Sequence, residues 1–202
     1  MRPVLIALTG PPCSGKTTLA ERLAARGARV VPEAAIEVIE ELNERLGGPD
    51  AQRAWRSQEP LEFQRLVAAR QLQRERDALR GVEDGASASA SESIIVFDRT
   101  SIDGVAYLRR AGQPVPEDIA AAARAARPDL VFELEVLAHA FHGRRSTGRS
   151  STLQDAYEIA AAIHAAYLEF GQPTISLAAA LSADARAEAV CAAVERWRAV
   201  HA

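Results

Sequence analysis

The chain has 202 residues, is 48% hydrophobic and carries a formal net charge of −3, so we expect a single domain over residues 1–202 with a core that needs no disulfide or metal cross-links. Its pI of about 5.9 counts against a dedicated nucleic-acid binder, whose domains usually have a pI above about 9. Two distant cysteines, no apolar run of membrane-spanning length and no secretory pattern near Met1 favour a reducing, cytoplasmic setting.

Apolar runs alternate along the chain with segments of helical periodicity. The runs that we expect to be strands are 4–8, 30–31, 94–97, 130–134 and 174–177. The segments that we expect to be helices are 17–26, 34–46, 61–79, 102–110, 116–126, 152–170 and 183–200. This alternation predicts βαβ units and therefore a parallel sheet with helices on both faces. Residues 82–93 are rich in Ala and Ser and predict a flexible loop, and residues 139–151 predict an arginine-rich, lid-like loop.

A phosphate-binding loop is the most specific motif in the chain. Residues 10–17 read G-P-P-C-S-G-K-T, which matches G-x-x-x-x-G-K-[ST] between a predicted strand and a predicted helix. Such a loop turns successive backbone N–H groups inward as an anion site, and the following helix adds its positive N-terminal dipole. The chain's one lysine, Lys16, stands where it reaches the β- and γ-phosphates, and the Thr17 hydroxyl stands where it binds Mg²⁺. The residues predicted to bind ATP are Gly10, Pro11, Pro12, Cys13, Ser14, Gly15, Lys16, Thr17 and Thr18.

Two classes of P-loop protein are disfavoured by the rest of the sequence. A GTPase reads guanine with an N-K-x-D segment, and no such segment exists because the one asparagine, Asn43, is not followed by the one lysine. An ATPase motor needs an apolar strand that ends in Asp-Glu, whereas the most apolar strand here ends in Asp98-Arg99-Thr100. We therefore expect transfer of phosphate to an acceptor rather than hydrolysis.

Two carboxylates follow predicted strands, at the edge of the sheet where open α/β folds bind their ligands. Glu33 follows the second strand and Asp98 follows the third, so we expect both beside the phosphate loop. A kinase that acts on a hydroxyl needs one carboxylate to accept the proton and another to help hold Mg²⁺. The alternatives are a charge that stabilises a helix N-terminus for Glu33 and a helix N-cap for Asp98.

These motifs in this order resemble the small nucleoside and nucleotide kinases, and in particular the AAA-domain-like ATP-binding proteins grouped with the ribosylnicotinamide kinase domain. Deoxynucleoside kinases have a similar Glu after strand two and an acid–Arg pair after strand three. The resemblance implies a three-layer α/β P-loop NTPase fold, with a five-stranded parallel sheet in the order 2-3-1-4-5. It places Glu33 at the base position, Asp98 at the Mg²⁺ and phosphate position, and Arg99 at a phosphate or acceptor contact. Thymidylate-kinase-like relatives and some antibiotic kinases have an acid in or beside the phosphate loop; this loop has none, so those identities are disfavoured.

Arginines of the predicted lid form a second candidate group. Arg144, Arg145 and Arg149 can close over the phosphates and neutralise charge in the transition state, as arginine fingers do. The alternative is a solvated basic loop. His139 and His142 are three residues apart without further ligands nearby in the sequence, so we expect no metal site there.

The long predicted helix at 61–79 has two readings. In the resembling kinases an equivalent helix borders the acceptor pocket, which makes Gln64 and Gln71 candidate acceptor contacts. The favoured reading is an exposed helix of mixed charge. Arg109 and Arg110, on a later helix, are expected to be surface charges.

Together these features predict a kinase that uses ATP and Mg²⁺ to phosphorylate a small hydroxyl-bearing acceptor, with a nucleoside-like molecule such as nicotinamide riboside as the favoured acceptor. The alternative is a nucleotide-binding regulatory ATPase or switch that acts on a protein partner. The net charge disfavours a nucleic-acid partner, no membrane partner is expected, and a homodimer stays open. The acceptor and the nucleotide preference also stay open.

Overall fold

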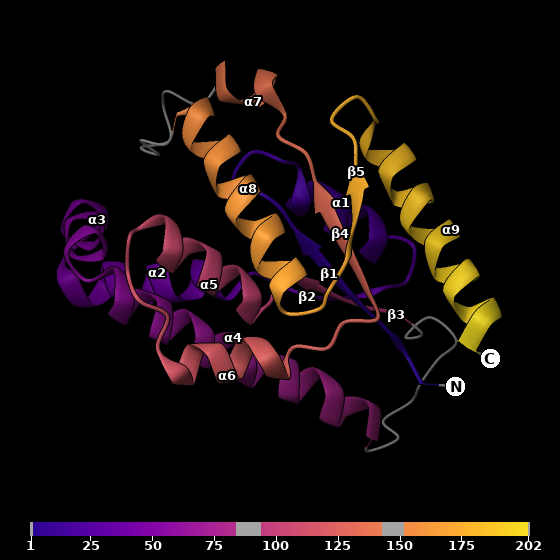
Figure 1. Cartoon of the computed structure of the whole chain (residues 1–202), viewed down its shortest axis with the longest axis horizontal. Coiled ribbons are helices and arrows are strands. Elements are labelled where there is room, and N and C mark those ends of the chain that lie inside the picture. Colours follow the sequence, from indigo (N-terminus) through magenta and orange to yellow (C-terminus); the bar gives the residue numbers. More distant parts are fainter. Residues whose placement is uncertain (1, 84–93, 143–151, 202) are drawn as a thin grey trace.

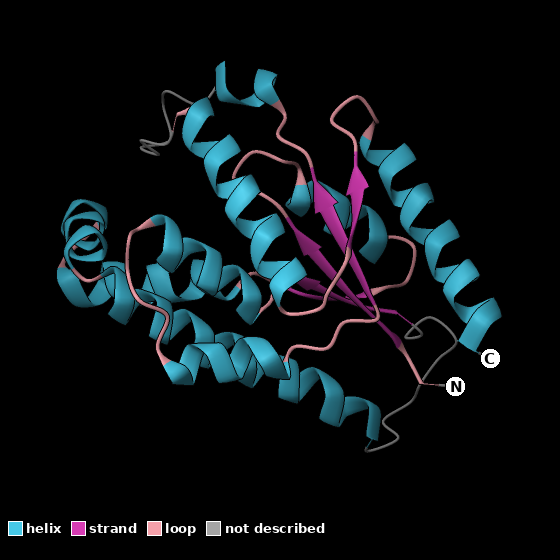
Figure 2. Ribbon diagram, in the orientation of Figure 1, coloured by secondary structure: helices cyan, strands magenta, loops and turns pink. Residues whose placement is uncertain are grey.

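A five-stranded parallel sheet forms the centre of the protein (Figures 1 and 2). The computed structural model describes residues 2–83, 94–142 and 152–201. The strands are β1 (Val4–Thr9), β2 (Arg29–Val31), β3 (Ile94–Asp98), β4 (Leu130–Leu134) and β5 (Thr174–Leu177). Their spatial order is β2-β3-β1-β4-β5, and every neighbouring pair is parallel. The predicted sheet, its order and its helices on both sides are confirmed.

Helices cover both faces of the sheet (Figure 2). The helices within the described residues are α1 (Lys16–Ala24), α2 (Ala34–Leu46), α3 (Pro49–Gln58), α4 (Pro60–Glu83), α5 (Ser101–Arg110), α6 (Glu117–Ala125), α7 (Ala138–His142), α8 (Leu153–Glu169) and α9 (Ala183–His201). None of the helices within the described ranges is long and apolar enough to cross a membrane.

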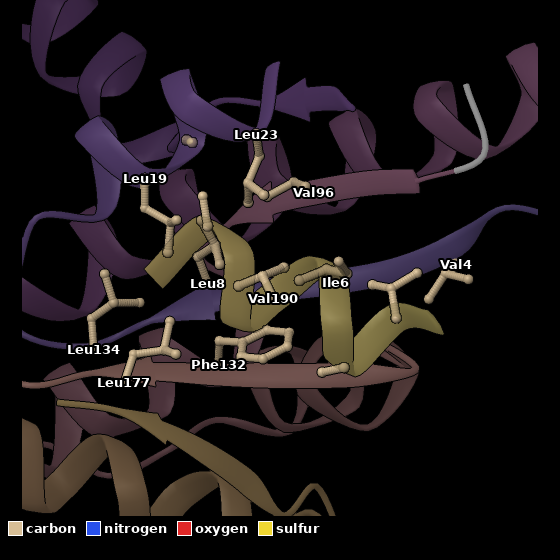
Figure 3. Close-up of a cluster of buried hydrophobic side chains, with 14 residues drawn as sticks. Val4, Ile6, Leu8, Leu19, Leu23, Val96, Phe132, Leu134, Leu177 and Val190 are labelled. Carbon is tan, nitrogen blue, oxygen red and sulfur yellow. The ribbon is translucent and has the colours of Figure 1, made fainter. Parts of the chain in front are cut away.

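The alternation of side chains along β1 assigns its residues to two cores. Ile6 and Leu8 belong to the core under α1 and α9. In this core they pack with Phe132 of β4 and Val190 of α9 (Figure 3). Ala7 faces the other way, into the core formed with α5, α6 and α8. Because both faces are covered, the strand reads as a continuous apolar run, which is what made it recognisable in the sequence.

Helix α3 was not expected from the sequence. The Gly-Gly-Pro sequence at residues 47–49 ends one helix and also begins the next: Gly47 caps α2 in the left-handed region and Pro49 is the first residue of α3. Proline suits that first position because its missing N–H has no partner in a helix anyway. Helix α3 packs against α2 and α4, where Trp55 joins their small apolar cluster.

Two predicted loops begin inside helices. Helix α4 continues through Gly81 to Glu83, so residues 82–83 of the expected flexible loop are helical, and residues 84–93 lie outside the described part of the chain. Helix α7 occupies residues 138–142, so the first four residues of the expected lid are helical. The lid arginines Arg144, Arg145 and Arg149 lie outside the described residues.

Candidate functional site

The phosphate loop joins the end of β1 to the start of α1, and its backbone requires glycine at two positions. Gly10 has φ of 133°, and a Cβ there would lie 2.6 Å from the carbonyl oxygen of Leu134. Gly15 has φ of 87° and is the N-cap of α1. Side chains are disfavoured at both positions, by collision at the first and by the left-handed backbone at the second. The two glycines of the sequence motif are therefore explained by the geometry of the loop.

Two carbonyl groups of this loop are held from outside. The backbone N–H of Leu137 donates to the Cys13 carbonyl at 3.1 Å. The guanidinium of Arg186, at the start of α9, donates from Nη1 to the Ser14 carbonyl at 2.7 Å and also binds the carbonyl of Ala178. In a trans peptide the N–H points away from the C=O, so these contacts direct the next two N–H groups to the opposite side of the loop.

Lys16 is buried against the loop that precedes it. Its Nζ atom donates to the carbonyl oxygens of Gly10 at 3.0 Å and Pro11 at 2.9 Å, and to the Ser14 hydroxyl at 3.3 Å. Burial, and then the nearby Arg99 guanidinium, lower the pKa of Lys16 to about 8. An ammonium group held in this way is poised to exchange carbonyl oxygens for the more negative oxygens of phosphate.

Arg99 connects the loop to two carboxylates. Its backbone has φ of 74°, in the left-handed region, directly after β3. Its Nη1 atom donates to the Gly10 carbonyl at 3.0 Å and to Asp103 Oδ1 at 2.9 Å, and its Nε lies 3.1 Å from Glu33 Oε1. Glu33 immediately precedes α2 but makes no side-chain capping bond to that helix. The two predicted residues Glu33 and Arg99 are thus brought together beside the phosphate loop.

Asp103 was missed by the sequence analysis, although it sits at the centre of a buried network. Thr9 donates to its Oδ1 at 2.7 Å, and Tyr167 of α8 donates to its Oδ2 at 2.7 Å. Thr100 and Asp103 also form a capping box at the start of α5. The spacing Thr-x-x-Asp was a usable sequence signal for that cap, whereas nothing in the sequence indicated Tyr167.

Asp98 ends β3 and is 6% exposed. The cap of α5 is Thr100, so the N-cap alternative for Asp98 is wrong. Its Oδ1 atom is buried and has no hydrogen-bond partner within the described residues, and burial raises the pKa of Asp98 to about 6. No group of three or more His, Cys, Asp or Glu that suits a metal occurs in the described ranges. One such orphaned carboxylate oxygen fits Mg²⁺, which usually binds one or two carboxylates, water and the phosphates of a substrate.

A cavity of about 510 Å³ adjoins the phosphate loop, within the usual size range of small-molecule sites. Residues 12–18 form one part of its wall, and Glu33, Arg99 and Asp103 form another. Asp98 is not among the lining residues. Glu33 therefore faces the space in which a small molecule would lie, whereas Asp98 lies outside its wall.

Two glutamines of α4 also belong to this cavity, so the exposed-helix reading is wrong for them. Gln64 is 9% exposed and Gln71 is 3% exposed, and both line the cavity. Gln71 donates to the carbonyl of Arg99 at 3.1 Å. The buried Ser101 hydroxyl makes no hydrogen bond to any described residue, and such a buried group normally has a partner. Ser101 and Gln64 both line the cavity, where a polar ligand can reach them.

The arginines predicted to be surface charges are on the surface. Arg109 pairs with Glu169 at 2.5 Å, and Arg110 pairs with Asp155 and with Glu158. By contrast, Arg53 and Arg56 of the unexpected helix α3 line the cavity.

Comparison with known proteins supports a nucleotide site. A family model described as AAA domain matches residues 5–185, which is most of the chain. No match was found among the curated proteins.

Proposed function

The chain belongs to the AAA domain family and is a nucleotide-binding P-loop protein, and from that premise we propose that it is a kinase that transfers the γ-phosphoryl group of ATP to a hydroxyl of a small, nucleoside-like acceptor. The observation that carries this proposal is the Glu33 carboxylate, held by Arg99 in the wall of a cavity that the phosphate loop also lines. A hydroxyl bound there has a proton acceptor on one side and the phosphate loop on the other.

The phosphate loop supplies the donor end of the site. Phosphate oxygens would replace the carbonyl oxygens of Gly10 and Pro11 as acceptors for the Lys16 ammonium. They would also accept hydrogen bonds from the inward N–H groups of the loop. The Thr17 hydroxyl and the Asp98 carboxylate would hold Mg²⁺, which neutralises phosphate charge when it is bound.

Glu33 is proposed to be the general base. The acceptor oxygen forms a bond to the γ-phosphorus, the bond from that phosphorus to the bridging oxygen of ADP breaks, and the hydroxyl proton passes to Glu33. Arg99 pairs with the carboxylate and holds it in one orientation. The network of Asp103 with Thr9 and Tyr167 in turn fixes Arg99.

Acceptor recognition is assigned to polar side chains in the wall of the cavity. The Gln64 amide and the Ser101 hydroxyl line the cavity, next to the apolar surfaces of Phe63 and Val67. A flat molecule with hydrogen-bonding edges and a ribose-like hydroxyl suits this mixture. Arg144, Arg145 and Arg149 are proposed to close over the phosphates from the lid.

A transfer assay tests the proposal. Purified protein with Mg·ATP is incubated with nucleosides, vitamins and aminoglycoside-type alcohols, and phosphate on the acceptor is measured together with ADP release. We expect one class of acceptor to stimulate ADP release, and we expect E33Q to abolish the stimulation while E40Q, an exposed acid of α2, preserves it. Slow ATP hydrolysis that no acceptor changes would contradict the kinase and support a nucleotide-controlled switch.

A further inference from the structure

Helix α3 brings two guanidinium groups to the cavity. Arg53 and Arg56 are three residues apart, so they share one face of the helix, and both line the cavity. Helix α3 packs against α2 and α4 and lies at the left edge of Figure 1, well away from the sheet. The two arginines therefore reach the cavity from a different element than the one that supplies Lys16.

The chemistry of this part of the wall favours an oxyanion. The Arg56 guanidinium lies over the Phe63 ring, 5.2 Å from its centroid, a cation–π contact that helps to position the group. Arg53 also contacts Asp50 of the same helix, but that carboxylate is 95% exposed, and an exposed pair of this kind contributes little to stability. Arginine forks bind carboxylate and phosphate through two parallel hydrogen bonds.

The carboxylates that line the cavity already have a cationic partner. Glu33 and Asp103 both pair with Arg99 near the phosphate loop. No other carboxylate is among the lining residues within the described ranges, whereas α3 contributes two guanidinium groups to the wall.

We infer that the acceptor carries a carboxylate or a phosphate, which Arg53 and Arg56 bind while its hydroxyl lies at Glu33. This inference rests on the proposed kinase function and narrows its substrate class from nucleoside-like molecules to anionic ones. It also separates the roles of the cations, with Lys16 serving the nucleotide and the α3 arginines serving the acceptor.

Matched acceptors test the inference. Each pair differs by one anionic group and keeps the same free hydroxyl: uridine with orotidine and nicotinamide riboside with nicotinate riboside for carboxylate, and adenosine with adenosine 3′-monophosphate for phosphate. We expect the anionic member of at least one pair to have the higher kcat/KM, by about tenfold or more as for a charge-assisted hydrogen bond. The double variant R53Q/R56Q should remove that preference and leave the Kd for Mg·ATP unchanged. The control is R45Q, an exposed arginine that lies over Trp55 but does not line the cavity.

The possible outcomes are distinct. Phosphorylation with no charge preference, or an equal loss in R45Q, overturns the inference and leaves the kinase proposal intact. A weaker affinity of R53Q/R56Q for Mg·ATP also overturns it, because the arginines would then serve the nucleotide. No transfer to any acceptor, neutral or anionic, with nucleotide binding preserved, is a failure of the proposed function itself.

A binding measurement decides the inference even without turnover. In the W197F background, Trp55 of α3 is the one remaining tryptophan, and it lies between the two arginines in sequence. Protein saturated with Mg²⁺ and a non-hydrolysable ATP analogue is titrated with inorganic phosphate or acetate, against chloride at equal ionic strength. We expect a saturable fluorescence change that R53Q/R56Q removes, with phosphate and acetate distinguishing the two oxyanions. A change that does not saturate, or that persists in R53Q/R56Q, overturns the inference.

Discussion

Arg186 donates a 2.7 Å hydrogen bond from Nη1 to the carbonyl oxygen of Ser14, although 172 residues separate the two in the chain. Arg186 is 3% exposed and also binds the Ala178 carbonyl, so it ties the loop after β5 to the phosphate loop. Burial lowers its pKa, although an arginine still keeps its charge. Helix α9 therefore helps to shape the loop that follows β1.

Replacing Arg186 should weaken nucleotide binding without direct loss of a ligand contact. In R186A the Ser14 carbonyl loses its outer partner, and we expect the Kd for Mg·ATP to rise by about 10- to 100-fold, the cost of one or two charged hydrogen bonds. Displacement of a fluorescent nucleotide measures the affinity, and circular dichroism confirms the fold. R186K should recover part of the affinity.

A control separates this effect from general damage to α9. Arg22 forms an exposed ion pair with Asp184 at the same end of that helix, so R22A should bind nucleotide normally. If R186A loses thermal stability but binds Mg·ATP as tightly as the unaltered protein, the Arg186 contact is only structural.

Lys16 should be indispensable to nucleotide binding. Its single Nζ atom donates to three acceptors, a geometry that suits an ammonium group and not the planar guanidinium of arginine. We expect K16A and K16R to weaken nucleotide binding by orders of magnitude while circular dichroism stays unchanged. An active K16A protein would refute the phosphate-loop assignment.

The depressed pKa of Lys16 makes a further test possible. Because the folded protein begins to lose this proton near pH 8, and phosphates favour the ammonium form, nucleotide affinity should fall as the pH rises through about 8. Binding at pH 8.5 should then take up protons, which calorimetry in buffers of different ionisation enthalpy detects. The signal should be absent in any residual binding by K16A.

Glu33 and Asp98 should have separable roles. E33Q keeps the shape of the side chain and removes the base, so we expect kcat to fall by roughly 10²- to 10⁴-fold with little change in nucleotide affinity. D98N removes the negative charge from the carboxylate that carries the orphaned oxygen, so we expect it to raise the Mg²⁺ concentration needed for nucleotide binding. A Mg²⁺ titration of nucleotide binding in both variants compares them, and a Mg²⁺ defect confined to E33Q would reverse the two assignments.

Glu75 should make the protein less stable as the pH rises. Burial raises the pKa of this α4 carboxyl to about 7 from an ordinary value of 4.5. The folded protein therefore holds a proton that the unfolded chain has lost, and the free energy of unfolding falls between about pH 4.5 and 7 and then levels off. We expect E75Q to have a higher urea midpoint than the unaltered protein at pH 8, and the difference to shrink towards pH 4.5. E62Q, which changes an exposed acid of the same helix, is the matched control; a constant difference across this range would contradict the argument.

Much of the fold and part of the site followed from local sequence. Buried parallel strands are continuous apolar runs, so the five strands and their alternation with helices were recognisable one segment at a time. The phosphate loop was equally recognisable, because its backbone has positive φ at Gly10 and Gly15 and so requires glycine there. Position after a strand was enough to predict that Glu33 lies beside that loop, since the carboxyl ends of parallel strands share one edge of the sheet.

The remaining features depend on contacts between distant segments. Local pattern misjudged Gln64 and Gln71 as exposed, because α5 and the turn after β3 cover them only in the folded chain. Arg186 lies 172 residues from Ser14, and Tyr167 lies 64 residues from Asp103, and no spacing rule connects such pairs. Arg53 and Arg56 became part of the cavity only because α3 folds back against α2 and α4. Periodicity and loop motifs report on backbone geometry within one segment, whereas burial and the lining of a cavity are set by which segments meet.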